Sequence, residues 1–182
     1  VTVDGDGIGQ FSVGDTKASI DKASFFMEGR SFLFYPGAYN FTPVVPNEYV
    51  DATPVPVSVL DDVRTAGGDG ASDVTFKATY NDKLEAAALE AAQALVESCG
   101  TYPGNQGDDC SSLIQGDHVT AISIKEMPTS LDSYSFDPTS FSGSVTYTVT
   151  TEGTLFAGTR DVGLTVKVDA RFDDDGMGPG WS

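Results

Sequence analysis

The chain has 182 residues, 40% of them hydrophobic, which suits one large or two small globular domains and argues against a disordered segment. Its 10 basic and 27 acidic residues give a net charge of −17, which makes nucleic acid and anionic lipid surfaces poor partners, because both attract clustered lysine and arginine. One histidine and two cysteines exclude most zinc sites and leave few nucleophile–base pairs.

The first third of the chain has the composition of short strands and turns. Glycine- and proline-rich turns separate its apolar runs, which cover residues 1–4, 11–13, 23–27, 31–35 and 38–42. Pro54 and Pro56 place any strand over residues 55–60 at the edge of a sheet, since proline cannot donate to a strand ladder. We predict a small all-β, sandwich-like module over residues 1–66.

A glycine-dense segment, residues 64–72, follows this module. Its composition is typical of a flexible linker, although a long hairpin loop would have the same residues. The next run, residues 74–80, alternates apolar and polar side chains with the period of a strand. We therefore expect a second module over residues 73–182, with this strand at its start.

The strongest helix signal in the chain covers residues 82–98. Asp82 and Glu85 have the spacing of a capping box. An apolar stripe of Leu84, Ala88, Ala91 and Leu95, widened by Leu89 and Val96, is expected to pack closely on a sheet.

Three alternating segments after the helix predict antiparallel strands: residues 118–127, 143–151 and 162–172. In the last two, Val145, Tyr147 and Val149 share one face, as do Leu164, Val166, Val168 and Ala170. The predicted fold class is α+β, with a small all-β module followed by an α+β module in which one helix packs on an antiparallel sheet.

Cys99 and Cys110 lie eleven residues apart, at the two ends of a glycine- and proline-containing loop. Such a loop can bend enough to bring the two cysteines to disulfide distance, although two unrelated buried thiols are the alternative. An even cysteine count in an acidic chain rich in Ser, Thr and Gly favours an oxidising compartment, so we expect a disulfide and an extracytoplasmic location. No stretch is long and apolar enough to span a membrane, so any anchor is expected outside this chain.

The order of these features resembles the extracytoplasmic regions of actinobacterial membrane-anchored envelope proteins. The run Tyr35-Pro36-Gly37-Ala38-Tyr39 is similar to a segment of PEGA-like β domains. The helix ending at Cys99, the loop to Cys110 and the strands after it resemble cystatin or NTF2-like folds. Teicoplanin-resistance-associated membrane proteins have a comparable layout. The resemblance implies binding or sensing at the envelope and supplies no catalytic residue.

His118 is the only imidazole and so the only usual general base near neutral pH. Asp117, Ser111 and Ser112 lie near it in sequence, but no nucleophile-elbow motif accompanies them. We therefore expect no catalytic residue and no enzyme. An NTF2-like enzyme using His118 is the least favoured alternative, and it would need this histidine in a cavity opposite a buried acid.

Three acidic clusters were weighed as cation sites: residues 4–6, residues 108–109 and residues 173–175. The first resembles the start of a calcium loop. It has Ile8 where an EF-hand needs Asp or Asn, and Asp15 where an EF-hand needs Glu. Turns and solvated loops explain all three clusters, and we expect neither a metal nor a cofactor.

Aromatic side chains gather in the first module, where most are expected to form its core: Phe25, Phe26, Phe32, Phe34, Tyr35, Tyr39 and Phe41. An exposed row of them would suit stacking on sugar rings. The sequence thus favours a non-catalytic extracytoplasmic segment that binds or senses a cell-wall glycan or an envelope protein. The alternative is an adhesive or structural surface module, similar to a pilin or a virion surface component, which an exposed edge strand would support.

Overall fold

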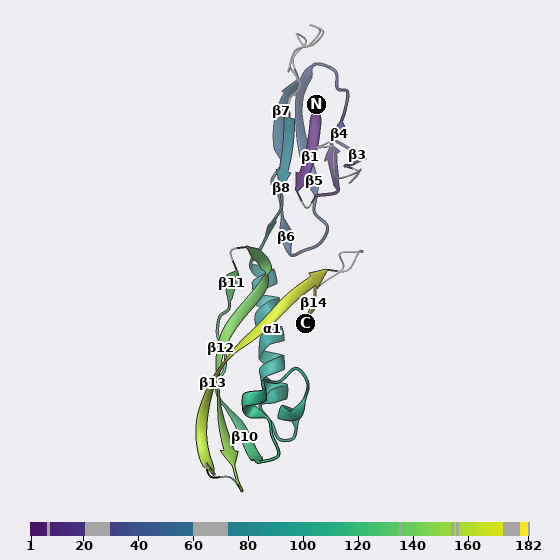
Figure 1. Cartoon of the computed structure of the whole chain (residues 1–182). Coiled ribbons are helices and arrows are strands. Elements are labelled where there is room, and N and C mark those ends of the chain that lie inside the picture. Colours follow the sequence, from purple (N-terminus) through teal and green to yellow (C-terminus); the bar gives the residue numbers. More distant parts are fainter. Residues whose placement is uncertain are drawn as a thin grey trace. The chain divides into compact units, whose positions relative to one another are not determined.

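The computed structural model describes residues 1–6, 8–20, 30–59, 73–134, 136–153, 155, 157–172 and 179–181. The chain divides into two compact units, Val1–Asn81 and Asp82–Ser182 (Figure 1).

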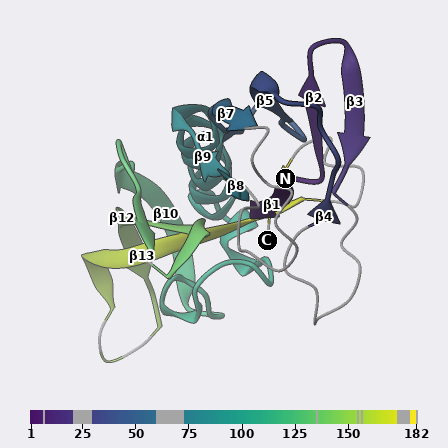
Figure 2. The ribbon, with the colours of Figure 1, turned by 90° about the horizontal axis from the view of Figure 1, so that it is seen from above.

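The first unit contains two main sheets and a short ladder. One sheet has the order β4 (Arg30–Ser31), β1 (Thr2–Asp6) and β8 (Asp73–Lys77). The other has the order β3 (Thr16–Ser19), β2 (Gln10–Val13), β5 (Gly37–Val44) and β7 (Val55–Val59). The short ladder pairs β6 (Val50–Asp51) with β9 (Thr79–Tyr80). The hairpin of β2 and β3 is easily followed in Figure 2.

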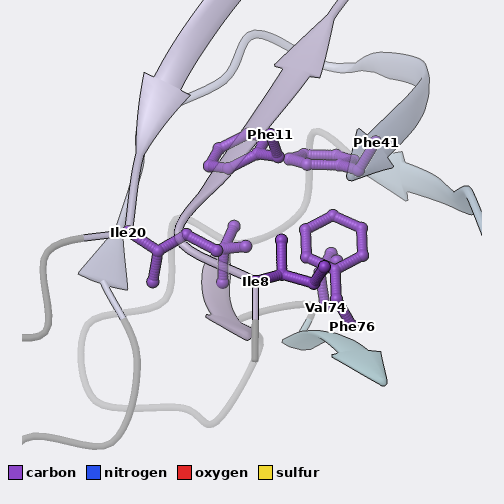
Figure 3. Close-up of a cluster of buried hydrophobic side chains, with 7 residues drawn as sticks. Ile8, Phe11, Ile20, Phe41, Val74 and Phe76 are labelled. Carbon is purple, nitrogen blue, oxygen red and sulfur yellow. The ribbon is translucent and has the colours of Figure 1, made fainter. Parts of the chain in front are cut away.

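The core of this unit is filled by apolar side chains from both main sheets. Phe11 and Phe41 from one sheet face Val74 and Phe76 from the other (Figure 3). The ring centroids of Phe11 and Phe76 are 6.1 Å apart, so the two sheets are in direct aromatic contact. Val3, Ile8 and Ile20 complete the buried cluster. The two sheets thus pack face to face as a small β-sandwich.

The strand β8 corrects the predicted domain boundary. We expected residues 74–80 to open the second module, but β8 pairs in parallel with β1, with Thr2 opposite Asp73 and Asp6 opposite Lys77. The division of the chain therefore lies between Asn81 and Asp82. Alternation shows which face of a strand is buried but does not show the strand with which it pairs. The predicted linker, residues 64–72, and the boundary at residue 66 lie outside the described residues.

Two prolines occupy strand positions that a proline tolerates. Pro56 lies in β7, which is an edge strand of its sheet as predicted. Pro43 lies in β5 opposite Phe11 of β2, but β7 pairs only with the first part of β5, as far as Phe41. Within the described residues, Pro43 therefore has a paired strand on one side only.

The second unit is built on helix α1 (Asp82–Cys99) and a sheet whose described strand pairs are all antiparallel. Its long strands are β10 (Val119–Glu126), β12 (Asp137–Thr151) and β13 (Gly158–Phe172), in the order β10-β12-β13. Two short strands extend it: β11 (Asp132–Tyr134) pairs with β12, and β14 (Pro179–Trp181) pairs with the end of β13. Two short 3-10 turns, η1 (Gly104–Gln106) and η2 (Ser112–Ile114), lie between α1 and β10.

Helix α1 packs its small apolar face on β13 and β12. Leu84, Ala88 and Val96 are buried as expected, but Ala92 is fully buried where we predicted Ala91. Asp82 is also not the helix cap, because it is the first helical residue. On the sheet, Val145, Tyr147 and Val149 share a buried face, as the alternation predicted.

The chain is therefore a mixed but strand-dominated fold, which confirms the predicted class only in part. The part of the chain that the structure describes contains a single α-helix, and its strand pairs are antiparallel except for β1 with β8. Strands make up far more of the chain than the term α+β implies.

Candidate functional site

A pocket of about 300 Å³ lies beside the C-terminal half of α1 in the second unit. Three kinds of element surround it: the helix end, the inner faces of β12 and β13, and the disulfide loop, which we define as residues 99–115. The lining side chains are Leu95, Val96, Cys99, Asp109, Cys110, Ser111, Ile114, Val145, Tyr147, Leu164, Thr165, Val166 and Lys167. We call this pocket the groove.

The floor of the groove is apolar and rigid. Val96, Ile114, Val145 and Val166 are buried within it. Tyr147 is buried too, and its hydroxyl donates a hydrogen bond to the Val96 carbonyl across 3.2 Å. Burial raises the pKa of this phenol, so the hydroxyl keeps its proton and the bond persists at neutral pH. The floor thus ties the helix to the sheet through both packing and a buried hydrogen bond.

The predicted disulfide is present and forms one wall of the groove. Cys99, buried at the end of α1, is bonded to Cys110, with the two Cα atoms 5.6 Å apart. Gln115 holds the loop from the other end, because its side-chain amide donates to the carbonyls of Gly107 at 2.7 Å and Cys110 at 3.1 Å. The wall is therefore fixed by one covalent bond and by several hydrogen bonds.

Asn105 is the buried polar centre of this loop. It is completely buried, its side-chain amide donates to the Ile114 carbonyl, and its backbone N–H donates to the Thr101 carbonyl at 2.8 Å. Its Oδ1 has no hydrogen-bond partner among the described residues. By fixing Ile114, Asn105 supports the floor of the groove. Neither Asn105 nor Gln115 was predicted from the sequence, since an amide in a glycine-rich loop also suits an exposed turn.

The strand β13 contributes an edge to the groove, which alternation alone could not reveal. Leu164, Thr165, Val166 and Lys167 are consecutive, and all four line the pocket. Successive side chains of a strand point to opposite faces of a sheet. The groove contacts β13 continuously from Leu164 to Lys167. In this stretch β12 is the one strand that pairs with β13 among the described residues.

The rim of the groove is polar. Three exposed polar residues line it there: Asp109, Thr165 and Lys167. Asp108, weighed earlier with Asp109 as a cation site, is also exposed at the loop surface. The groove therefore combines a dry floor with an open rim that carries one charge of each sign.

The residues weighed for catalysis are not brought together in the groove. Ser111 lines it, but its hydroxyl accepts a hydrogen bond from the Leu113 N–H at 3.3 Å as the cap of η2. His118 is exposed just before β10 and is absent from the groove lining. The cavity that the NTF2-like enzyme alternative needs around His118 is thus not this groove.

Two of the three acidic clusters lie within the described residues, in β1 and in the disulfide loop. Asp4 to Asp6 belong to β1, which extends past the predicted end at Asp4. Within the described ranges, no three Asp, Glu, His or Cys residues are grouped as metal ligands would be. The cluster at residues 173–175 lies outside the described residues. Across the described part of the chain, no helix has the length and apolarity needed to cross a membrane.

The aromatic residues of the first unit do not form an exposed row in the segments that the structure describes. Phe32 and Phe34 pack against core rings, with the centroids of Phe34 and Phe41 5.1 Å apart. Leu33 and Tyr35, which alternate with them, are the exposed positions, at 103% and 87%. Phe25 and Phe26 lie outside the described residues. Within residues 31–35, Tyr35 alone offers less to a sugar than the groove offers to an apolar side chain.

A second hollow, of about 530 Å³, lies in the first unit and is lined by Asp51, Ala52, Thr53, Lys77 and Thr79. All of these except Ala52 are exposed, so this hollow lacks the buried floor of the groove.

Comparisons with protein-family models, with curated proteins and with solved structures find no match to this chain. The geometry of the groove is therefore the main evidence on function.

Proposed function

We propose that this chain is a non-catalytic, extracytoplasmic binding segment of a membrane-anchored envelope protein, and that the groove is its binding site. In this proposal the first unit corresponds to a PEGA-like β module and the second to a cystatin- or NTF2-like module. The ligand is a cell-wall component or an envelope protein, and the anchor lies outside this chain.

The groove is the observation that carries the proposal. It is open to solvent, yet its floor is made of buried apolar side chains such as Val145 and Val166. Ligand sites commonly combine an apolar lining with a few polar groups at defined positions, and about 300 Å³ is at the small end of their range. The disulfide supports an oxidising, extracytoplasmic setting, because such bonds persist there.

Co-sedimentation with purified peptidoglycan sacculi, with and without teichoic acids and at low and high salt, tests this proposal. Leu164→Asp places a charge in the half-buried lining of the groove, and Leu113→Asp makes the same change at a position that is 61% exposed and outside the lining. We expect salt-resistant retention of the wild type and of Leu113→Asp, and loss of retention for Leu164→Asp. Equal retention of both variants would remove the groove from the proposal.

One observation favours the alternative of an adhesive or structural surface module. Residues 158–169 of β13 pair with a strand on one side only, in the part of the chain that the structure describes. Such an edge can join sheets of separate molecules. Sedimentation velocity across a concentration series separates the alternatives, because an assembling module would form larger species while a binding module would stay unchanged.

A further inference from the structure

We infer that the groove takes an extended polypeptide segment, which adds to the sheet as a new strand along the edge of β13. This inference rests on the proposed function and names the class of its ligand. The edge belongs to residues 158–169, which among the described residues pair with β12 alone, while β14 covers only residues 170–172. In an antiparallel pair, alternate backbone N–H and C=O groups point away from the neighbour. These outward groups are a template for another strand.

The groove lies where such a strand would need it. The groove contacts the strand from Leu164 to Lys167, within the part of β13 whose outer side has no partner among the described residues, and the disulfide loop also lines it. A strand laid along β13 would turn every second side chain toward the floor formed by Val145, Tyr147 and Ile114. A volume of about 300 Å³ suits one or two aliphatic side chains better than a large rigid ligand. Backbone pairing supplies affinity in this mode, and the pocket supplies specificity.

Charge selects the occupant among extended segments. A second copy of the chain would bring another net charge of −17 to the interface, and this repulsion opposes pairing of two β13 edges. A segment with basic residues at its ends meets a chain of opposite net charge, and of the two rim charges Asp109 attracts it while Lys167 opposes it. The partner is therefore an extended protein segment with alternating aliphatic residues and basic flanks.

The test uses a synthetic peptide with capped ends and the sequence Lys-Lys-Val-Thr-Val-Thr-Val-Lys-Lys, titrated into the full oxidised chain. Two isomers carry backbone N-methyl groups, one on the three valines and the other on the two threonines and the lysine that follows the last valine. The isomers have the same composition and the same number of blocked amides. In an added strand only one of these alternate sets faces β13.

We expect the unmodified peptide and one isomer to bind with similar affinity, and the other isomer to bind at least about tenfold more weakly, because its lost hydrogen bonds are those to the edge. Leu164→Asp should weaken binding of the unmodified peptide, and Leu113→Asp should not. Equal binding of the two isomers, whether strong or weak, would overturn the inference, and so would a peptide that does not bind at all.

The two proposals fail separately. Salt-resistant retention on sacculi without discrimination between the isomers would leave a binding segment whose ligand is not a strand. Discrimination between the isomers without retention on sacculi would keep the strand site and move the proposed ligand from the wall to a protein.

Discussion

Removing the disulfide should destabilise the second unit and leave the first unit unchanged. The bond closes a loop with a sequence separation of 11 residues, for which the chain-entropy estimate is about 3 kcal/mol at 25 °C. Cys99 is only 3% exposed at the end of α1, so the double variant Cys99→Ser and Cys110→Ser also places a hydroxyl in a buried position. The loss should therefore be no smaller than the entropic estimate.

The chain offers a reporter for each part of this experiment. Its single tryptophan, Trp181, lies in β14 of the second unit, so tryptophan fluorescence follows that unit during urea unfolding. Far-UV circular dichroism follows both units. With a urea slope of about 1–3 kcal/mol/M, a loss of about 3 kcal/mol lowers the fluorescence midpoint by about 1–3 M.

The first unit serves as the internal control. Its dichroism transition should keep its midpoint in the double variant, and adding a reductant to the wild type should reproduce the shift in fluorescence. An unchanged fluorescence midpoint would show that the loop is held without the bond, by contacts such as those of Asn105 and Gln115. It would refute the reasoning that the disulfide fixes the wall of the groove.

Further predictions concern both units. Phe76→Ala should lower the free energy of unfolding of the first unit by about 3–5 kcal/mol. The dichroism transition should shift while the midpoint of tryptophan fluorescence stays the same. A shift in the fluorescence alone would place β8 in the second unit instead. Gly104→Ala would bring a methyl group within 2.5 Å of a backbone oxygen at the end of α1, and should lower the free energy of unfolding by about 1–3 kcal/mol. Gly163→Ala is the matched control, because its methyl group would meet nothing within 4 Å. Equal fluorescence midpoints for the two variants would contradict this prediction. A hydrogen bond from Lys125 lowers the pKa of Asp161, so the stability that this carboxylate adds is present at neutral pH and is lost as the pH falls through its folded pKa. Asp161→Asn should accordingly be slightly less stable than the wild type at neutral pH and equal to it in acid, and a difference that persists in acid would show another cause.

Local patterns predicted those features that depend on nearby residues. The helix over residues 82–98 matches α1, because its composition and apolar stripe decide its structure without help from the rest of the chain. The shared face of Val145, Tyr147 and Val149 followed from alternation. Ala92 replaced Ala91 in the buried face because both are small, so the stripe could rotate slightly to meet the sheet.

Features that depend on distant pairing were not predictable in this way. The pairing of β8 with β1 joins residues from opposite ends of the first unit, and neither strand carries a signal for the other. The exposed edge of β13 has the same origin, since the sequence gives the face of each side chain but not the number of neighbours beside a strand. The groove needs both this edge and the folded disulfide loop, so its position could not be predicted from the sequence.

Hydrogen exchange of the full chain, with and without the unmodified peptide, tests the central claim most directly. If the groove binds a strand along β13, the peptide should slow amide exchange within residues 158–169 and in the disulfide loop. The exchange rates should stay the same in β10, which lies at the other edge of the sheet, and in the strands of the first unit. Protection at β10 or in the first unit without protection in β13 would contradict the account.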